Sequence, residues 1–223
     1  MIDILIQNKE KILQAFIETN IMMIVSMIAS LIISLPLGTL MYALKSKFLI
    51  KNIFIYNILS FLVNTLRSIP FLIFIFLLIP VNRAIWGTSY GVISSFLPLT
   101  LVTISIYARF VEQAYLNVDQ SIIDRAISMG STKIDIIRYF LFPSIKNDLI
   151  LSFTSVVISL LSYSTVMGVI GAGGLGDYAF RFGYQQYNYK LMILIVIIFI
   201  IYVFIIQTIG YFIANYITME KKQ

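Results

Sequence analysis

The sequence predicts an all-α membrane protein with about five transmembrane helices. Of its 223 residues, 60% are hydrophobic and only 12% are charged, and the mean hydropathy is +0.95. A soluble chain of this length could not bury so much apolar surface, so the surrounding solvent must be lipid. The apolar residues also gather in runs that reach the roughly 20 residues a helix needs to cross a bilayer.

Each predicted span is a long apolar run, and the connections between the runs are short. The first run is expected to stay as a span, because charges of both signs precede it and it is longer than the apolar part of a signal peptide. No repeat or linker divides the chain, so we expect one membrane domain over residues 1–223. The predicted spans are residues 21–44, 54–80, 92–116, 149–170 and 191–213.

The basic residues predict which segments face the cytoplasm. An odd number of spans places the chain ends on opposite sides, and cytoplasmic segments carry the excess of Lys and Arg. One side holds Lys45, Lys47, Lys51, Arg109, Arg125, Lys133, Arg138, Lys146, Lys221 and Lys222, and the other holds Lys9, Lys11, Arg83, Arg181 and Lys190. The C-terminus and loop 117–148 are therefore expected in the cytoplasm. The net charge of +6 then needs no nucleic-acid partner.

Loop 117–148 predicts two short helices joined by a glycine. Ser121 and Asp124 have the spacing of a capping box, and so do Thr132 and Asp135. Gly130 is expected to end the first helix in a left-handed conformation, and Pro143 to end the second. The predicted apolar faces are Ile122, Ile123, Ala126 and Ile127 on the first helix, and Ile134, Ile137 and Leu141 on the second. Such helices could lie on the membrane surface or dock on a soluble partner.

Residues 124–143, here called the hook, resemble the EAA loop of ABC-importer permeases. That pattern is Glu-Ala-Ala, three residues, Gly, nine residues, Ile, any residue, Leu-Pro. Ala126, Gly130 and Pro143 match it at the correct spacing, whereas Asp124, Arg125, Phe140 and Phe142 replace the other members. Segments 67–71, 109–112, 169–177 and 181–185 are also similar to the methionine-importer permease group.

The resemblance implies a type I ABC-importer permease fold and a transport function. It implies a homodimer that binds two cytoplasmic ABC ATPase subunits and receives its substrate, expected to be methionine, from an extracytoplasmic solute-binding lipoprotein. By the same resemblance, the residues expected to couple the chain to the ATPase are Asp124, Arg125, Ala126, Ile127, Met129, Gly130 and Pro143.

A glycine-rich segment follows the fourth span. Gly171, Gly173 and Gly176 satisfy the dinucleotide-binding spacing G-x-G-x-x-G. That fingerprint requires a preceding strand and an acidic residue about 20 positions later, and neither is expected here. We predict a tight turn instead, with glycines that allow close approach. The polar residues that follow, Asp177, Arg181 and Tyr184, are either solvated or contacts for the binding protein.

Span 149–170 carries a stripe of serines at helical spacing, Ser152, Ser155, Ser159 and Ser162. Small hydroxyl residues allow two membrane helices to approach closely. The stripe is therefore either a packing seam or a lining of the substrate path, and Met167 would be an apolar gate just beyond it.

Arg67 is the charged residue placed deepest in a predicted span. A charge at the bilayer centre costs at least about 2.5–3.5 kcal/mol and calls for a partner or a watery cavity. Glu112 and Asn64 are the candidate partners, and Pro70 allows a helix break nearby. Arg67 either forms a structural ion pair or contacts the substrate.

The sequence offers no enzyme chemistry of its own. It contains no cysteine and no histidine, which removes the common metal ligands and bases, and no cofactor or metal is expected. Two other classes stay open: a secondary transporter or channel independent of an ATPase, and a membrane scaffold. The first usually shows internal repeats and intramembrane carboxylates, which we do not find in the sequence.

Overall fold

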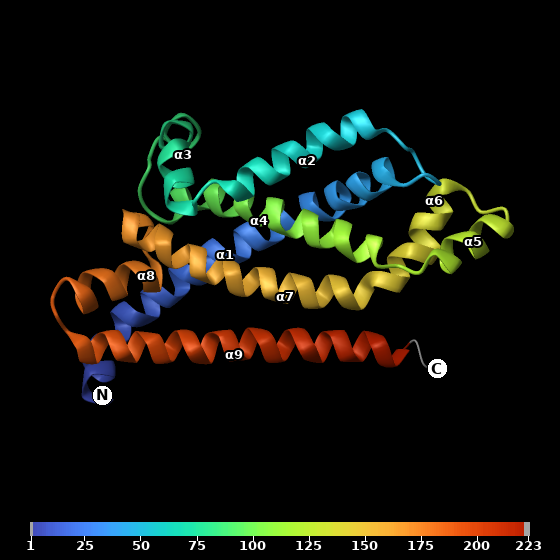
Figure 1. Ribbon diagram of the computed structural model, residues 1–223. Helices are drawn as coiled ribbons and strands as arrows, with labels where there is room; N and C mark the ends of the chain where they lie inside the picture. The colour runs from blue at the N-terminus through green and yellow to red at the C-terminus, as the bar shows by residue number, and fades with distance from the viewer. Residues whose placement is uncertain (1, 221–223) are drawn as a thin grey trace. The chain divides into compact units, whose positions relative to one another are not determined.

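The regular elements are all helical in the computed structural model, which describes residues 2–220 and the side chains of residues 6–217. This confirms the predicted fold class, and Figure 1 follows the helices along the chain. The elements are α1 (Ile2–Lys45), α2 (Ile53–Ser68), α3 (Phe71–Trp86), α4 (Val92–Leu116), α5 (Gln120–Ser128), α6 (Lys133–Asp135), η1 (Ile136–Leu141), α7 (Phe142–Met167), η2 (Gly168–Ala172), α8 (Gly174–Tyr178), η3 (Ala179–Tyr184) and α9 (Tyr189–Glu220). The elements labelled η are π-helical turns.

In the described part of the chain, four helical stretches are long and apolar enough to cross a membrane, and a bent pair could form a fifth span. The pair is α2 and α3, which are separated by a break at residues 69–70. Pro70 lies at the bend, where it lacks an N–H and disfavours helix in the residue before it. The helix break that Pro70 allows is present. The single span predicted over residues 54–80 is divided in two by it.

The helices belong to two compact units, each built from three separate segments of the chain. Unit 1 comprises residues 1–30, 69–103 and 157–207, and unit 2 comprises residues 31–68, 104–156 and 208–223. In unit 1, Leu175 and Tyr178 of α8 pack with Leu191 and Ile195 of α9. In unit 2, an apolar cluster joins the end of α1, the end of α4, α5, η1 and the start of α7.

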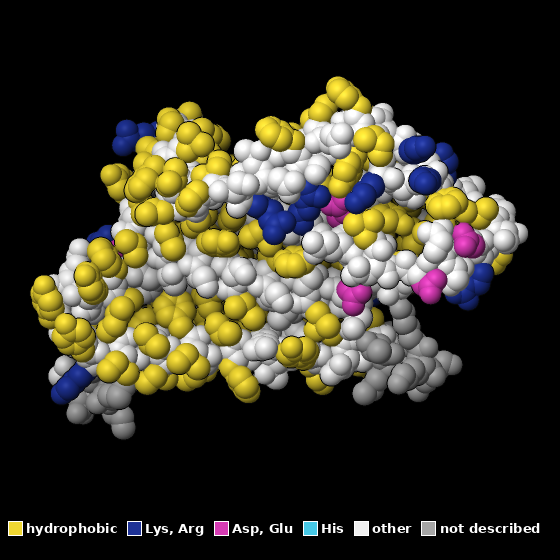
Figure 2. All heavy atoms as spheres, in the orientation of Figure 1, with side chains coloured by type: hydrophobic (Ala, Val, Ile, Leu, Met, Phe, Trp, Pro, Cys, Tyr) yellow, Lys and Arg dark blue, Asp and Glu magenta, His cyan; other side chains and the backbone are white. Residues whose placement is uncertain are grey.

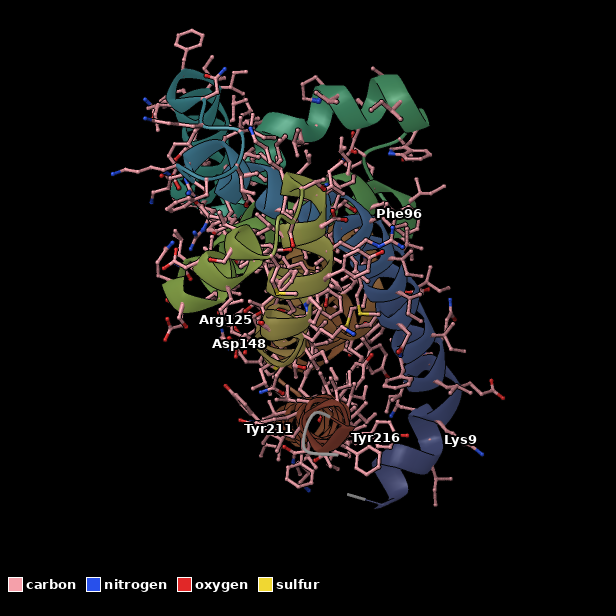
Figure 3. All side chains as sticks on the ribbon, turned by 90° about the vertical axis from the view of Figure 1, so that its right-hand side faces the viewer. Lys9, Phe96, Arg125, Asp148, Tyr211 and Tyr216 are labelled. Carbon is pink, nitrogen blue, oxygen red and sulfur yellow. The ribbon has the colours of Figure 1, made fainter. Side chains whose placement is uncertain are left out.

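Much of the apolar surface is left exposed, as expected in lipid. Only 11% of the apolar window of α9 is buried. Figure 3 looks along this helix and shows side chains radiating from it, including Tyr211 and Tyr216, which are 52% and 62% exposed. In Figure 2 apolar side chains are spread widely over the visible face.

Candidate functional site

Helix α5 begins at a different cap from the predicted one. The N-cap is Asp119, whose carboxylate accepts the N–H of Ser121 at 2.8 Å. This hydrogen bond lowers the pKa of the Asp119 carboxyl below its ordinary value. The capping box predicted from Ser121 and Asp124 is therefore wrong. An aspartate two positions upstream of Ser121 caps as well as serine does, and spacing alone could not rank the two.

Gly130 ends α5, as predicted, with a φ of +73°. Its N–H donates to the carbonyl of Ile127 at 2.9 Å, and the Ser131 N–H donates to the carbonyl of Ala126 at 3.1 Å. These two bonds form a Schellman motif, which satisfies carbonyls that the helix end would leave open. Gly130 therefore acts through its backbone.

The predicted apolar face of α5 is divided between core and surface. Ile123 and Ala126 are 4% and 0% exposed, whereas Ile127 and Met129 are 43% and 73% exposed. Ala126 has no surface to offer a partner, so we withdraw it as a direct contact and assign it to packing. Asp124 and Arg125 are exposed, as their predicted role requires.

A cavity of about 400 Å³ lies against α5 within the hook. Arg125 and Met129 line it from α5 and its C-cap, and Tyr139 and Pro143 line it from the chain that follows. The other lining residues are Ile122, Phe140 and Ser144. The exposed surface of α5 and its C-cap therefore borders this cavity, which we call the hook cavity.

The second part of the hook differs from the prediction after its first turn. The capping box of Thr132 and Asp135 is present. Pro143, however, does not end a helix, because residues 133–172 form one continuous helical stretch. The π-helical turn η1 precedes the proline, and the Phe142 N–H donates to the carbonyl of Ile137, five residues back. The wider turn accommodates the missing N–H of Pro143 without breaking the helix.

The same π-helical turn changes which residues share the buried face. Ile136, Leu141 and Ile145 are buried, at intervals of five and four residues. Ile134, predicted on the apolar face, is 74% exposed. The predicted apolar face assumed 3.6 residues per turn, and it fails here because the π-helical turn η1 has more residues per turn.

The glycine segment forms a tight turn, as predicted. Gly171, Gly173 and Gly174 have φ values of +101°, +89° and +82°. A Cβ at Gly176 would lie 2.5 Å from the Cα of Thr165, so α8 packs directly on the backbone of α7. The element before the turn is η2, a π-helical turn, so the strand that a dinucleotide fingerprint requires is absent from this described segment.

Two residues of α1 bind the start of α8, a contact that the sequence pattern did not indicate. The Gly174 N–H donates to Glu18 Oε2 at 2.8 Å, and the Leu175 N–H donates to Thr19 Oγ1 at 2.9 Å. The only indication in the sequence was that Glu18 and Thr19, a carboxylate and a hydroxyl, are adjacent at the start of an apolar run. Their partners, 156 residues away, could not be read from the sequence.

The polar residues after the turn are only partly exposed. Arg181 Nε lies 2.6 Å from Asp177 Oδ1, and their side chains are 56% and 18% exposed. Burial raises the pKa of the Asp177 carboxyl, and the Arg181 charge offsets this in part. Tyr184 is 64% exposed. The segment is thus mostly helical, and of the three predicted contacts Arg181 and Tyr184 are more accessible than Asp177.

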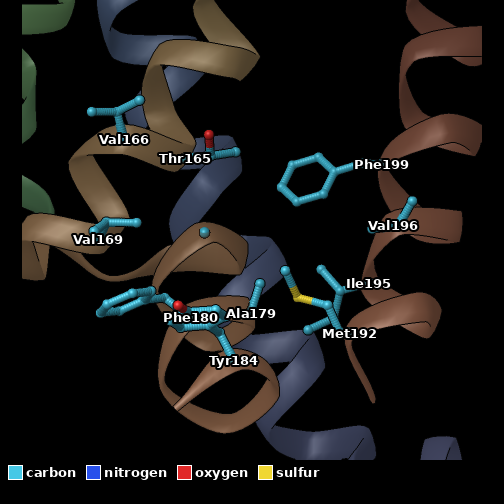
Figure 4. Close-up of a pocket in the computed structure, with 11 residues that line it drawn as sticks. Thr165, Val166, Val169, Ala179, Phe180, Tyr184, Met192, Ile195, Val196 and Phe199 are labelled. Carbon is cyan, nitrogen blue, oxygen red and sulfur yellow. The ribbon is translucent and has the colours of Figure 1, made fainter. Parts of the chain in front are cut away.

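A second cavity, of about 440 Å³, lies within unit 1 between η3 and α9. Figure 4 shows Met192 and Phe199 reaching from α9 toward Ala179 and Thr165. Its lining is almost wholly apolar, apart from the hydroxyls of Thr165 and Tyr184.

The serine stripe lies on α7 with its hydroxyls bonded to the helix itself. Ser155 Oγ donates to the Leu151 carbonyl at 3.1 Å, and Ser162 Oγ donates to the Ile158 carbonyl at 3.4 Å. Ser155 and Ser162 are exposed and Ser159 is half-buried. Met167 is 2% exposed and belongs to the core of its unit.

Arg67 is exposed and makes no ion pair within the part of the chain whose side chains are described. Both of its predicted partners bind Arg109 instead: Arg109 Nη1 donates to Glu112, and Arg109 Nε donates to Asn64 Oδ1 at 3.2 Å. The predicted pairing of Arg67 is therefore wrong. Arg109 lies three residues before Glu112, where helical side chains meet.

Comparison with known proteins gives one family match and close structural neighbours. The family described as "Binding-protein-dependent transport system inner membrane component" matches residues 34–221. A probable D-methionine transport system permease protein MetI from Vibrio cholerae is 36% identical over 203 residues, which cover 91% of this chain and 90% of the relative. The methionine import system permease protein MetP from Bacillus subtilis is 36% identical over 167 residues, 75% of each chain.

Two solved structures share the fold. A structure of the MetNI methionine ABC transporter in an inward-facing conformation superposes with a TM-score of 0.89 at 35% identity, covering 92% of this chain and 95% of that one. An amino acid ABC transporter with histidines has a TM-score of 0.79 at 18% identity, which supports the fold alone.

Proposed function

Because the chain belongs to the family of binding-protein-dependent transport system inner membrane components, we propose that it is the permease subunit of an ATP-driven amino-acid importer. Its proposed substrate is methionine. The support is that relatives over most of the chain are named as methionine permeases and that the structural neighbour is a methionine ABC transporter.

The proposed assembly is a homodimer with two cytoplasmic ABC ATPase subunits and an extracytoplasmic solute-binding lipoprotein. In this assembly the hook and the C-terminus face the cytoplasm. The support is the excess of basic residues on that side. Of these, Lys221 and Lys222 lie outside the described residues.

The observation that carries the function is the surface of α5. Ile127 and Met129 are 43% and 73% exposed although apolar, and Met129 lines the hook cavity together with Arg125. A short, capped helix with an apolar tip is suited to a groove in a protein partner. We assign ATPase docking to Asp124, Arg125, Ile127 and Met129, with Gly130 and Pro143 shaping the backbone.

The other predicted site residues keep weaker roles in the proposal. Arg181 and Tyr184 would meet the binding protein, because they are exposed beside the glycine turn, with Asp177 holding Arg181 in place. Ser155, Ser159 and Ser162 would line the substrate path or meet the second copy. Arg67 would bind substrate or an anionic partner group, and Met167 would act as a gate only after a rearrangement, since it is buried.

Docking is tested by co-purification of the chain with its cognate ATPase. Ile127→Glu and Met129→Glu place a charge in the proposed contact and should reduce the retained ATPase at least about tenfold. The matched control is Ile50→Glu, which changes an equally apolar and 55% exposed residue outside the hook. Full retention of the ATPase by both hook variants would refute docking at α5.

A further inference from the structure

One face of α2 carries polar residues four positions apart, and these residues bind α4. Tyr56, Ser60 and Asn64 all contact the pair formed by Arg109 and Glu112. All five residues lie in unit 2. The rest of α2 is rich in Ile, Leu, Phe and Val.

The contacts form one connected network. Arg109 Nε donates to Asn64 Oδ1 at 3.2 Å, and Nη2 donates to the Ser60 carbonyl at 3.1 Å and to the Ser60 hydroxyl. Arg109 Nη1 donates to Glu112 Oε2, and the Tyr56 hydroxyl donates to Glu112 Oε1 at 2.9 Å. The side chains of Arg109 and Glu112 are only 12% and 3% exposed.

Apolar packing does not hold α2 in the same way. The large apolar cluster of unit 2 takes its residues from α1, from Leu49 and from α4 and later elements, and none of its described members comes from α2. Within α2, all of whose side chains are described, Val63 is the one buried residue. In lipid an apolar helix gains little by leaving the acyl chains, so hydrogen bonds and charge contacts decide its partners. The network around Arg109 therefore holds α2 against α4.

The end of α4 that carries Arg109 is also joined firmly to α5. Ala114 and Tyr115 are buried in the same apolar cluster as Ile123 and Ala126 of α5. Only residues 117–119 connect the two helices, and one of them, Val118, also packs on the cluster. Movement of α5 must therefore displace the end of α4 that carries Arg109.

We propose that Arg109 is the positioning residue that makes α2 follow α5. It would transmit the displacement of the docking helix to α2, the helix that leads into the Pro70 bend, without touching the ATPase. This role rests on the proposed function, because the displacement comes from the docked ATPase. A buried ion pair often adds little to folding stability. The Arg109–Glu112 pair is therefore compatible with a role in transmitting movement.

The test cuts the network from the α2 side, which leaves the Arg109–Glu112 pair intact. The variant is Tyr56→Phe/Ser60→Ala/Asn64→Leu, and the single variants Asn64→Leu and Tyr56→Phe cover the case in which the triple variant does not fold. The matched control is Asn57→Leu/Thr65→Leu, which changes exposed polar residues of α2 outside the network. Thr65 Oγ1 donates to the Phe61 carbonyl of its own helix.

Two spin labels report the coupling directly. The chain has no cysteine, so Phe61→Cys on α2 and Gln120→Cys on α5 can be labelled alone. Mixing with an excess of unlabelled chain leaves both labels on one copy of the dimer, and their separation is measured by pulsed electron resonance. In the native network we expect one narrow distance distribution, unchanged by ATP in the complex with the ATPase. In the triple variant we expect the distribution to become at least about twice as wide and to shift with ATP. Equal, narrow distributions in both would overturn the proposal.

The second readout is the number of ATP molecules hydrolysed per substrate molecule imported by the reconstituted transporter. We expect this ratio to rise about tenfold in the network variants and to stay unchanged in the control. An unchanged ratio in the network variants would contradict the role of Arg109. If the native transporter shows no ATP-driven uptake, the proposed function fails. The spin-label distances of the chain without ATPase then still decide whether the network holds α2.

Discussion

Gly130 shows how a single backbone angle shapes the hook. Its φ is +73°, and a Cβ there would have no neighbour within 4 Å, so a side chain is opposed by conformation and not by space. Gly130→Ala should lower the local stability of α5 by about 1–2 kcal/mol, which corresponds to roughly 5–30-fold faster amide exchange. Hydrogen exchange of residues 120–128 measures this. Gly130→Asn should lose less, because Asn tolerates the left-handed region. Equal effects of Ala and Asn would contradict this explanation.

Gly176 presents the opposite case, in which space is the constraint. A Cβ there would lie 2.5 Å from the Thr165 Cα and 2.6 Å from the Thr165 carbonyl oxygen, and neither backbone atom can rotate away. We expect Gly176→Ala to lower the melting temperature of the purified chain by several degrees. A melting temperature equal to that of the native chain would mean that α8 does not pack so closely on α7.

Arg67 and Arg109 mark the limit of sequence reasoning at this scale. Arg67 was singled out because it interrupts an apolar run, yet it is Arg109 that is 12% exposed and holds Glu112. A signal for the network existed in the polar residues 56, 60 and 64, which share one helix face, and in the spacing of Arg109 and Glu112. It could not be used without knowing that α2 packs on α4.

At the scale of the element, the first turn of α5 depends on the N-cap Asp119, whereas the sequence pattern predicted Ser121. Asp119→Ala removes the carboxylate that accepts the Ser121 N–H, so we expect the first turn of α5 to fray and its amides to exchange faster. Asp119→Asn should largely preserve the cap, and Ser121→Ala should have little effect. Hydrogen exchange of residues 120–124 at constant pH separates these outcomes. A larger effect of Ser121→Ala than of Asp119→Ala would restore the original assignment.

Pro70 and Pro143 show which helix ends the sequence could predict. Pro70 divides the span predicted over residues 54–80, a break that the sequence allows but does not require. Pro143 was expected to end its helix, but the π-helical turn η1 carries the helix past it. Turns of this kind follow from tertiary packing of Ile136 and Leu141, which are 3% and 0% exposed, and leave no local pattern.

At the scale of the whole molecule, the membrane class and family followed from composition and from motifs far apart in the chain. The contacts between α1 and α8 and between α2 and α4 did not, because they join residues that only the fold brings together. Orientation still rests on the basic residues alone.

Orientation can be tested with single cysteines, since the native chain has none. Tyr187→Cys follows η3, and Ser131→Cys lies in the hook. In intact spheroplasts a membrane-impermeant maleimide should label Tyr187→Cys and spare Ser131→Cys. Inverted membrane vesicles should show the reverse. Labelling of Ser131→Cys from outside would place the hook on the wrong side for an ATPase.

The measurement that tests the central claim most directly is uptake by proteoliposomes that contain this chain, its cognate ATPase and its binding protein. We expect saturable accumulation of methionine that requires ATP on the side of the membrane that carries the ATPase and disappears when the Ile127→Glu/Met129→Glu chain is used. L- and D-methionine are compared with unrelated amino acids in the same preparation. Saturable uptake of another solute without any of methionine, or methionine uptake that needs no ATP, would contradict the account.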